Sequence, residues 1–340
     1  MSDTDTNRVY LLAERPTGRP DEDTFELAER PVPEPGPGEA LVRTCYMSVD
    51  PYMRGRMRAG DSYADSWGVG DPLQAGVVGE VVESNGAGVE PGDAVTGDLQ
   101  WADYATAPGT ALTEVDPDRA PLSTYLGVLG MPGNTAYFGV QEVTQPQAGE
   151  TFVITGAAGA VGSVAGQIAK LNGAHVVGLA GSDEKVAFLE EVGFDVGINY
   201  KSTDDYGAAL DEAAPGGVDA YFDNVGGEVT DAVFPRLNVD ARVGVCGQIA
   251  LYNATEVPTG PRKLTTLIES RATVEGFLVS DFSERFDQSV PQLGEWVQSG
   301  QLQYRETVTE GLENAPGAFL GLFDGENIGK QLVRVSDYEG

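Results

Sequence analysis

The sequence predicts an α/β protein in which a small barrel of short strands precedes a doubly wound parallel sheet. Up to about residue 120, short apolar and β-branched runs are separated by Gly and Pro, as in barrels of short strands. Beyond that point strands alternate with amphipathic helices, which is typical of βαβ units in a parallel sheet. A glycine-rich turn follows the first strand of this second part, where such sheets bind nucleotides.

The elements of the first part follow from their composition. Residues 31–38 are rich in Pro and Gly and are expected to form a turn, and Pro91-Gly92-Asp93 is expected to form another. Apolar, β-branched and aromatic residues predict strands at residues 41–49, 77–82 and 101–107. Residues 331–335 are strand-like again, so the end of the chain is a candidate to return to the first domain.

The second part predicts a longer series of elements. Strands are expected at residues 151–155, 175–180, 195–200, 218–223, 241–247 and 272–279. Between the first two strands, Val161, Ala165 and Ile168 are spaced for one face of a helix over residues 161–171. Ser182 is expected to cap a second helix that runs through Glu191 and ends at Gly193.

The charge of the chain is unusual for its size. Its 340 residues contain 53 Asp and Glu against 21 Lys and Arg, a formal net charge of −32, and only five of the basic residues are Lys. The acidic residues are dispersed along the chain, so they repel nucleic acids and anionic membranes, and they also repel one another. High salt would screen this repulsion. We interpret the composition as adaptation to high salt; the alternative is an ordinary acidic cytosolic protein.

Cysteine usage and the N-terminus set further limits. Cys45 and Cys246 could form at most one disulfide and cannot supply a four-thiolate zinc site. Residues 1–8 are polar and acidic and do not resemble a secretory signal, and no apolar run approaches the ~20 residues that span a membrane. A cytoplasmic location is therefore expected.

The glycine-rich turn runs from Gly156 to Gly162, with the spacing GxxGxxG. Gly159 would let the backbone approach a pyrophosphate, and Gly162 would let the following helix lie close to the sheet. The turn follows a strand and opens a helix, the context that supports nucleotide binding. The alternative is a packing turn rich in Gly and Ala.

The end of the next strand indicates which nucleotide is bound. NAD-binding proteins usually place an acidic residue there to hold the ribose 2′-hydroxyl, but residues 179–182 are uncharged. Lys185 follows one helical turn later, where it could meet a 2′-phosphate, although an exposed helix residue is an equally simple explanation. Asp183 and Glu184 are interpreted as first-turn acids that stabilise the helix N-terminus. The pattern therefore favours NADPH.

Longer motifs now resemble a known family. They are DPYMRGRM at 50–57, GMPGNTAYFG at 130–139, AAGAVGSVAGQIAK at 157–170, GSDEK at 181–185, INYK at 198–201, FDNVGGE at 222–228, CGQIALYN at 246–253, EGFLV at 275–279 and GLENAPGAFLGLFDGENIGKQLV at 311–333. They are similar to the medium-chain dehydrogenase/reductase superfamily, in its zinc-independent branch of prostaglandin, 2-alkenal and curcumin reductases. The resemblance covers roughly residues 40 to 335.

The resemblance implies two domains and a homodimer. A GroES-like catalytic domain would comprise residues 1–125 joined by 305–340, and a Rossmann NADP-binding domain residues 126–304. Contacts to NADPH would come from Gly159, Ala160, Val161, Gly162, Ser182, Lys185, Tyr200, Asn224, Cys246, Gly247, Gln248, Ile249, Tyr252, Phe277, Leu278, Val279 and Asn327. Within that set, Gly159–Gly162 would hold the pyrophosphate, and Lys185 and Tyr200 the 2′-phosphate.

The residues also limit the chemistry. His175 is the single histidine and lies in a predicted strand, so a Ser-His-Asp relay and a zinc site of the alcohol dehydrogenase kind are both disfavoured. The resemblance marks Tyr252 as the tyrosine beside the substrate carbonyl. Its hydroxyl would stabilise the enolate oxygen when hydride reaches the β-carbon of an α,β-unsaturated ketone or aldehyde. An ordinary loop tyrosine is the alternative.

The motif at residues 50–57 supplies further candidates. Tyr52 is the second candidate catalytic residue and would shape the substrate pocket from the catalytic domain. Arg54 and Arg56 fit either a loop anchor through Asp50, a cofactor contact or structural ion pairs. Met47, Met53 and Met57 fit pocket lining or, more commonly, core packing.

Three functions use the same cofactor site. They are enone or alkenal reduction, which the motifs favour, quinone reduction by a related zinc-independent branch, and non-catalytic NADPH sensing. No metal, nucleic acid or membrane partner is expected.

Overall fold

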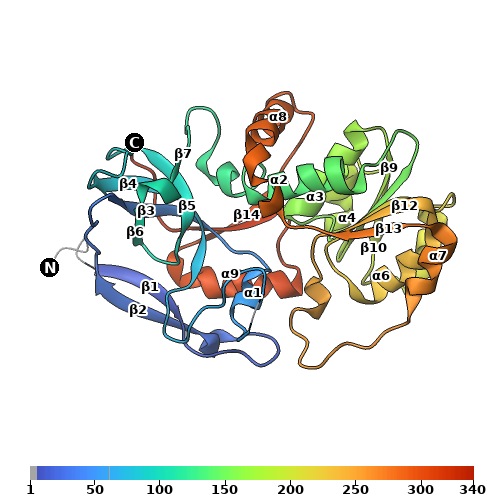
Figure 1. The fold of residues 1–340 in the computed structure, drawn as a ribbon, viewed down its shortest axis with the longest axis horizontal. Helices are drawn as coiled ribbons and strands as arrows, with labels where there is room; N and C mark the ends of the chain where they lie inside the picture. The colour runs from blue at the N-terminus through green and yellow to red at the C-terminus, as the bar shows by residue number, and fades with distance from the viewer. Residues whose placement is uncertain (1–5, 61) are drawn as a thin grey trace. The chain divides into compact units, whose positions relative to one another are not determined.

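The computed structural model describes residues 6–60 and 62–340, which form two compact units (Figure 1). The first unit holds the chain up to Leu126 together with Glu306–Asn327 and Gln331–Gly340. The second holds Gly127–Arg305 and Ile328–Lys330. No helix among the described residues is long and apolar enough to cross a membrane.

The first unit is built on a curved antiparallel sheet that wraps into a barrel-like form (Figure 1). Its strand order is β14 (Glu306–Glu310), β15 (Lys330–Arg334), β3 (Glu39–Ser48), β4 (Gln74–Ser84), β5 (Ala94–Gln100) and β7 (Thr113–Glu114), with β6 (Tyr104–Pro108) paired to β3. Strand β15 pairs with β3 through Leu332 opposite Ser48 and Val333 opposite Met47. The predicted return of the chain end to the first domain is confirmed.

A hairpin of β1 (Thr6–Leu12) and β2 (Phe25–Pro31) forms a separate two-stranded sheet. The sequence analysis did not predict it. Strand β1 is mostly buried, and Phe25, the first residue of β2, stacks on Trp101 with ring centroids 6.1 Å apart. Helix α9 (Ala315–Asp324) adds Phe319 to the same aromatic cluster, edge-on to Trp101 at 6.2 Å. The hairpin is therefore fixed by aromatic packing.

The three methionines of the first unit are core residues. Met47, Met53 and Met57 have no exposed surface and belong to one apolar cluster. Of the two roles considered for these side chains, pocket lining and core packing, the structure shows core packing.

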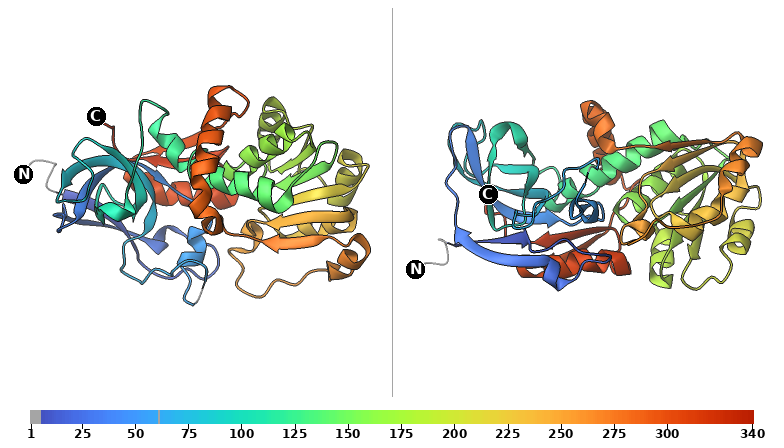
Figure 2. Two further views of the ribbon diagram at one scale, coloured as in Figure 1. Left: turned by 45° about the horizontal axis from the view of Figure 1, so that its top comes forward. Right: turned by 60° about the horizontal axis from the view of Figure 1, so that its bottom comes forward.

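The second unit is the predicted doubly wound parallel sheet. Its spatial order is β10 (Val196–Asn199), β9 (His175–Ala180), β8 (Thr151–Thr155), β11 (Val218–Asp223), β12 (Leu237–Val245) and β13 (Thr273–Gly276). All five strand pairs are parallel. Helices cover both faces of the sheet (Figure 2). They are α2 (Met131–Phe138), α3 (Ala160–Leu171), α4 (Asp183–Glu191), α5 (Tyr206–Ala213), α6 (Gly227–Val233), α7 (Thr266–Ser270) and α8 (Phe286–Gln298).

Helix α4 shows why these residues form the predicted element. The Ser182 hydroxyl accepts a hydrogen bond from the backbone N–H of Lys185, as an N-cap does. Two acids occupy its first turn, where the helix dipole stabilises negative charge. After the helix, Gly193 has a φ of +93°, a left-handed conformation that favours glycine.

Two strand boundaries in the second unit differ from the prediction. Strand β12 begins at Leu237, four residues before the predicted Ala241, because Leu237 already pairs with Val218 of β11 before the register shifts to Arg242 opposite Ala220. Asp240 has a φ of +64° within this strand and interrupts its alternation. Strand β13 ends at Gly276, and a 3-10 helix, η9 (Val279–Arg285), begins where the prediction still placed strand.

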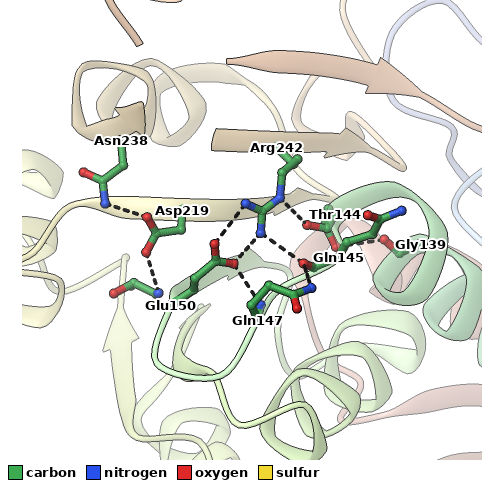
Figure 3. Close-up of polar contacts among 9 residues, drawn as sticks. Gly139, Thr144, Gln145, Gln147, Glu150, Asp219, Asn238 and Arg242 are labelled. Atoms are coloured by element: carbon green, nitrogen blue, oxygen red, sulfur yellow. Dashed lines mark hydrogen bonds and ion pairs between the residues drawn. The ribbon is translucent and has the colours of Figure 1, made fainter. Parts of the chain in front are cut away.

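An arginine holds the turn between the π-helix η5 (Gly139–Thr144) and β8 (Figure 3). The Arg242 guanidinium donates to the Thr144 and Gln145 carbonyls, each at 3.0 Å, and makes a two-pronged ion pair with Glu150. Gln145 ends the helix in a left-handed conformation with a φ of +42°. Arg242 therefore supplies the helix C-terminus with the donors that its last carbonyls lack.

Candidate cofactor and substrate site

The glycine-rich turn joins the end of β8 to the start of α3. Gly156 has a φ of +60° and accepts a hydrogen bond from the Gly159 N–H at 3.0 Å. A Cβ placed on Gly162 would lie 2.3 Å from the Gly156 carbonyl oxygen, so only glycine lets the helix start this close to the turn. The Gly329 N–H donates to the Ala158 carbonyl at 2.7 Å and fixes the outer side of the turn.

This turn can hold a pyrophosphate. The first N–H groups of an α-helix have no partners within the helix, and α3 presents them from Ala160 onward. Ala160 and Val161 are partly exposed at this end, whereas Gly162 is buried. The geometry fits the dinucleotide phosphate cradle that the glycine spacing predicts.

The corner after β9 brings together Ser182, Lys185 and Tyr200. A Cβ placed on Gly181 would lie 2.9 Å from the Tyr200 hydroxyl, so this side chain crosses the backbone at the end of the strand. The pKa of Lys185 is lowered, first by desolvation and then by the charge of Lys201. The 2′-phosphate contacts predicted from the sequence therefore lie at one corner of the sheet, and Lys201 joins them.

Asp183 has a specific partner at this corner. The Asn199 side-chain amide donates to the Asp183 carboxylate at 2.7 Å. The acid therefore stabilises the helix N-terminus, as interpreted from the sequence, and is also bonded to the end of β10.

A buried carboxylate organises the centre of the site. Asp223, at the end of β11, has no exposed surface. Its carboxylate accepts five hydrogen bonds, from the Thr155 and Thr230 hydroxyls, the Val225 and Gly226 N–H groups and the Gln248 amide, at 2.7–3.0 Å. These donors satisfy the lone pairs of the carboxylate, which keeps the buried charge tolerable.

Asn224 links β11 to β8. Its backbone N–H donates to the Thr155 hydroxyl at 3.0 Å, and its side-chain amide donates to the Thr155 carbonyl at 2.8 Å. The side chain is therefore oriented by the end of β8, beside the glycine-rich turn.

The loop of residues 246–252 is tied to the same strand end. The N–H groups of Cys246 and Gly247 both donate to the Asp223 carbonyl, at 2.9 and 3.0 Å. Gln248 uses its side chain for the Asp223 carboxylate, and Ile249 leads the short 3-10 helix η7 (Ile249–Leu251). Burial raises the pKa of the Cys246 thiol to about 12, so this side chain remains a thiol at neutral pH.

Tyr252 ends this loop and folds back over it. A Cβ placed on Gly247 would lie 3.4 Å from the Tyr252 hydroxyl. Desolvation raises the pKa of Tyr252 above its usual value of 10, so the hydroxyl stays protonated at neutral pH and can donate. The structure thus places the predicted catalytic tyrosine on a loop that Asp223 anchors.

The segment after β13 contributes in two ways. Phe277 is buried and packs edge-on against Phe222, with ring centroids 5.9 Å apart. Leu278 is exposed, and Val279 begins η9. Phe277 is thus a core side chain, so a cofactor contact from it would come from its backbone.

The first unit holds the other predicted residues. Tyr52 is partly buried against the core, and desolvation raises its pKa. Tyr63, which the sequence analysis did not single out, is exposed and close enough to influence that pKa. Asn327 follows α9 in the same unit.

The two arginines of the 50–57 motif are structural anchors. Arg54 is buried and donates to the Gly18 and Pro16 carbonyls. Arg56 donates to Gln74 at 2.6 Å and stacks over Trp67 at 4.7 Å. These contacts run to other segments of the first unit.

His175 has a structural place. It begins β9, and its Nε2 lies 3.1 Å from the carbonyl of Ala213, at the end of α5. This agrees with its interpretation as a strand residue.

Sequence reasoning missed Asp223, Thr155, Asn199 and Lys201. Each stands at the carboxyl end of a strand or just beyond it, where ligands of parallel sheets bind. Their position at the strand ends is the sequence signal that could have identified them as site residues.

Comparisons with known proteins agree with this geometry. Residues 8–115 match a family model described as the N-terminal domain of oxidoreductase, and residues 160–296 match one described as zinc-binding dehydrogenase. The NADPH-dependent curcumin reductase of Escherichia coli is 45% identical, over 97% of this chain and 97% of its own. The NADP(+)-dependent 2-alkenal reductase of Nicotiana tabacum is 42% identical, over 99% of each chain.

The chain belongs to the medium-chain dehydrogenase/reductase family. A crystal structure of CurA from Vibrio vulnificus in complex with NADPH superposes on this medium-chain reductase with a TM-score of 0.93 and 41% identity, covering 97% of this chain and 99% of that one. The fold predicted from the sequence is therefore confirmed for both parts of the chain.

The name of one matching model mentions zinc. Within residues 6–60 and 62–340 of this medium-chain reductase, no three His, Cys, Asp or Glu side chains lie together as a metal site requires. Both cysteines are free thiols, and Cys45 is buried. The match identifies the family through the nucleotide-binding unit.

Proposed function

We propose that the protein is an NADPH-dependent reductase that transfers hydride to the β-carbon of α,β-unsaturated ketones and aldehydes. The observation that carries this proposal is the loop of residues 246–252, which Asp223 anchors and which ends in the protonated Tyr252. The likeness to the curcumin and 2-alkenal reductases supports the same class of substrate.

The residues of the second unit fit NADPH. The glycine-rich turn would hold the pyrophosphate, because a Cβ at Gly162 has no room and α3 begins there. The corner of Ser182, Lys185 and Tyr200 would hold the 2′-phosphate. Asn224, the 246–252 loop, the backbone of Phe277–Val279 and Asn327 would complete the contacts. When bound, NADPH supplies the hydride.

Tyr252 would act on the substrate carbonyl. Its hydroxyl would donate a hydrogen bond to the carbonyl oxygen, on which negative charge develops as the β-carbon is reduced. Its raised pKa keeps the proton on the hydroxyl, so Tyr252 stabilises the oxygen without giving up the proton. The α-carbon would then take a proton from water.

The first unit holds Tyr52, the second proposed catalytic residue. We assign residues 1–125 and 305–340 to the catalytic domain, with Tyr52 shaping the pocket. Tyr52 is partly buried, and its raised pKa keeps the hydroxyl protonated, which suits a pocket wall that also offers one polar atom.

The test follows oxidation of NADPH and of NADH in low and multimolar KCl. The acceptors are a medium-chain enone, a 2-alkenal and a benzoquinone. NADPH-specific turnover of the enone or alkenal is expected, and Tyr252→Phe should lower kcat by about 10²-fold, as for loss of one oxyanion donor. Turnover of quinone alone would place the protein with quinone reductases. NADPH binding without turnover of any acceptor would contradict the enzymatic proposal and favour a sensor.

The proposal includes a homodimer and a cytoplasmic location. Strand β13 forms an edge of the parallel sheet, and its four residues are all exposed (Figure 2). Nearby, Leu264 is 73% exposed and Ile268 is 78% exposed, an apolar surface next to unpaired backbone groups. Sedimentation of the wild type is expected to give a dimer, and Ile268→Asp is expected to shift it toward monomer. A wild-type monomer at micromolar concentration would contradict the dimer.

A further inference from the structure

The corner between β9 and α4 carries more positive charge than Lys185 alone. Lys201 follows Tyr200 just beyond β10, and its Cε lies 3.3 Å from a Cβ placed on Gly181. The side chains of Tyr200 and Lys201 therefore both cross the backbone of Gly181. That glycine leaves them room at the end of β9.

The two lysines at this corner repel each other. After desolvation, the charge of Lys201 is the next cause of the lowered pKa of Lys185. Like charges held close together cost free energy, and at Lys185 the carboxylate of Glu184 acts in the opposite sense. The chain has 53 acidic residues and only five lysines, yet two of the five meet here. A phosphate monoester, with a charge of about −1.5 to −2 at neutral pH, is the kind of ligand that offsets two ammonium groups.

One asparagine orders the corner. The Asn199 side-chain amide donates to the Asp183 carboxylate at 2.7 Å, and the Asn199 side-chain oxygen accepts from the backbone N–H of Lys201 at 3.1 Å. A single side chain thus connects the first turn of α4 with the segment that carries Tyr200 and Lys201. It also holds the Asp183 carboxylate against β10.

The orientation of Asp183 matters for the choice of nucleotide. An acidic residue near the end of the strand that corresponds to β9 binds the ribose 2′-hydroxyl in NAD-dependent proteins and would repel a 2′-phosphate. Because Asn199 bonds the Asp183 carboxylate, that carboxylate is directed at the asparagine.

We propose that Lys201 is a second cation for the 2′-phosphate of NADPH, and that Asn199 is a positioning residue that keeps the Asp183 carboxylate away from that phosphate. This inference rests on the proposed function, since it concerns the same NADPH site. It assigns nucleotide preference to two residues at the end of β10, in addition to Lys185 on α4.

The experiment measures binding of NADPH, NADH and 2′,5′-ADP by calorimetry at fixed salt. Lys201→Gln is expected to weaken NADPH and 2′,5′-ADP roughly tenfold or more, the usual effect of losing a hydrogen bond to a charged group, and to leave NADH unchanged. Lys201→Arg should retain most of the affinity. Lys170→Gln is the matched control, because Lys170 pairs with Asp195 at the opposite end of β9 and the variant has the same net charge.

Asn199 is tested through the ratio of affinities. Asn199→Ala is expected to lower the preference for NADPH over NADH severalfold, because the Asp183 carboxylate loses its partner. Adding Asp183→Asn should restore the preference, which a merely structural loss would not do. The slope of log Kd for 2′,5′-ADP against log salt should also become shallower in Lys201→Gln, since one cationic contact is lost.

The outcomes separate this inference from the proposed function. A wild type that prefers NADPH while Lys201→Gln keeps that preference would overturn the inference alone. Equal weakening of NADPH and NADH would do the same, because it would indicate a structural effect. A wild type that binds NADH as well as NADPH and ignores 2′,5′-ADP would overturn the NADPH assignment and the inference together.

Discussion

At the scale of single residues, the site depends on side chains that serve as anchors as much as on those predicted to touch ligands. Lys185, Tyr200 and Tyr252 could be predicted from the strand end and from the family motifs. Asp223 could not, because its importance comes from five donors on four separate segments, and sequence spacing does not reveal such convergence. The same holds for Asn199, whose side chain makes one hydrogen bond to Asp183 on α4 and another to the backbone of Lys201 beyond β10.

Asp223→Asn should destabilise the protein although it changes the shape of the side chain little. One carboxylate oxygen becomes an NH2 group, which donates and cannot accept. At least one of the buried groups that now donate to Asp223 would therefore lose its acceptor. The expected loss is about 2–4 kcal/mol of unfolding free energy, measured by chemical denaturation. The exposed Asp204→Asn, with the same charge change, should be nearly neutral. Equal stability of the two variants would contradict the anchoring role.

Tyr252 gives a prediction for the pH dependence of turnover. Its pKa is raised above 10 by burial, so it remains a donor throughout the neutral and mildly alkaline range. No alkaline decline of kcat from this group is expected below about pH 10, and the Tyr252→Phe profile should run parallel to that of the wild type. A decline near pH 8 that vanishes in Tyr252→Phe would show that the hydroxyl ionises early and would contradict this role.

At the scale of elements, segments with several agreeing local signals could be predicted, whereas irregular segments and the long helix α8 were not. Helix α4 was predicted over its observed range because cap, first-turn acids and terminal glycine agree. The start of β12 was missed because Asp240 adopts a left-handed conformation inside it. The π-helix η5 has no local signature; its end is fixed by Arg242, which lies 98 residues beyond Thr144 in the sequence.

Arg242→Met should release this turn. The variant leaves the Thr144 and Gln145 carbonyls without their donor and Glu150 without its cation, so a loss of about 2–3 kcal/mol is expected. The pKa of Glu150 lies below its usual 4.5, chiefly because of the hydrogen bond from Arg242. The stabilisation is therefore present above pH 4.5 and is lost as the pH falls through the lowered pKa.

The measurement compares the free energies of urea unfolding of the wild type and of Arg242→Met at pH 7 and near pH 3. The difference between the two proteins is expected to be smaller at the lower pH. Arg236→Met is the control, because its partner Asp211 is 65% exposed and such surface pairs contribute little to stability. A gap independent of pH would assign the effect to the carbonyl contacts alone.

At the scale of the whole molecule, the two-part architecture could be predicted because each part has its own hydrophobic period. The net charge of −32 leads to a separate prediction, on how stability depends on salt. In the second unit some acidic residues form ion pairs, such as Asp195 with Lys170. The 21 basic residues of the chain are too few to pair with all 53 acidic residues. Most of the negative charge therefore needs screening by salt.

Thermal stability should rise with KCl concentration from about 0.1 M to the molar range. The reason is screening of mutual repulsion among carboxylates, and the measurement is the unfolding temperature at fixed pH. Sucrose of equal osmolarity is the control, because it is excluded from protein surfaces without screening charge. A Tm that is highest at low salt, or that sucrose raises equally, would contradict adaptation to high salt.

The pairing of β15 with β3 has a consequence for how the chain is made. The second unit is inserted in the chain of the first, so a ribosome completes residues 127–305 before it reaches β14 and β15. Until then, the part of β3 that pairs with Leu332 and Val333 lacks its neighbour. An unpaired edge is a template for wrong pairing, and domains generally fold in the order of synthesis. In this protein most of the nucleotide-binding unit, all but Ile328–Lys330, can fold first, and the β3 residues that pair with β15 wait for the end of the chain.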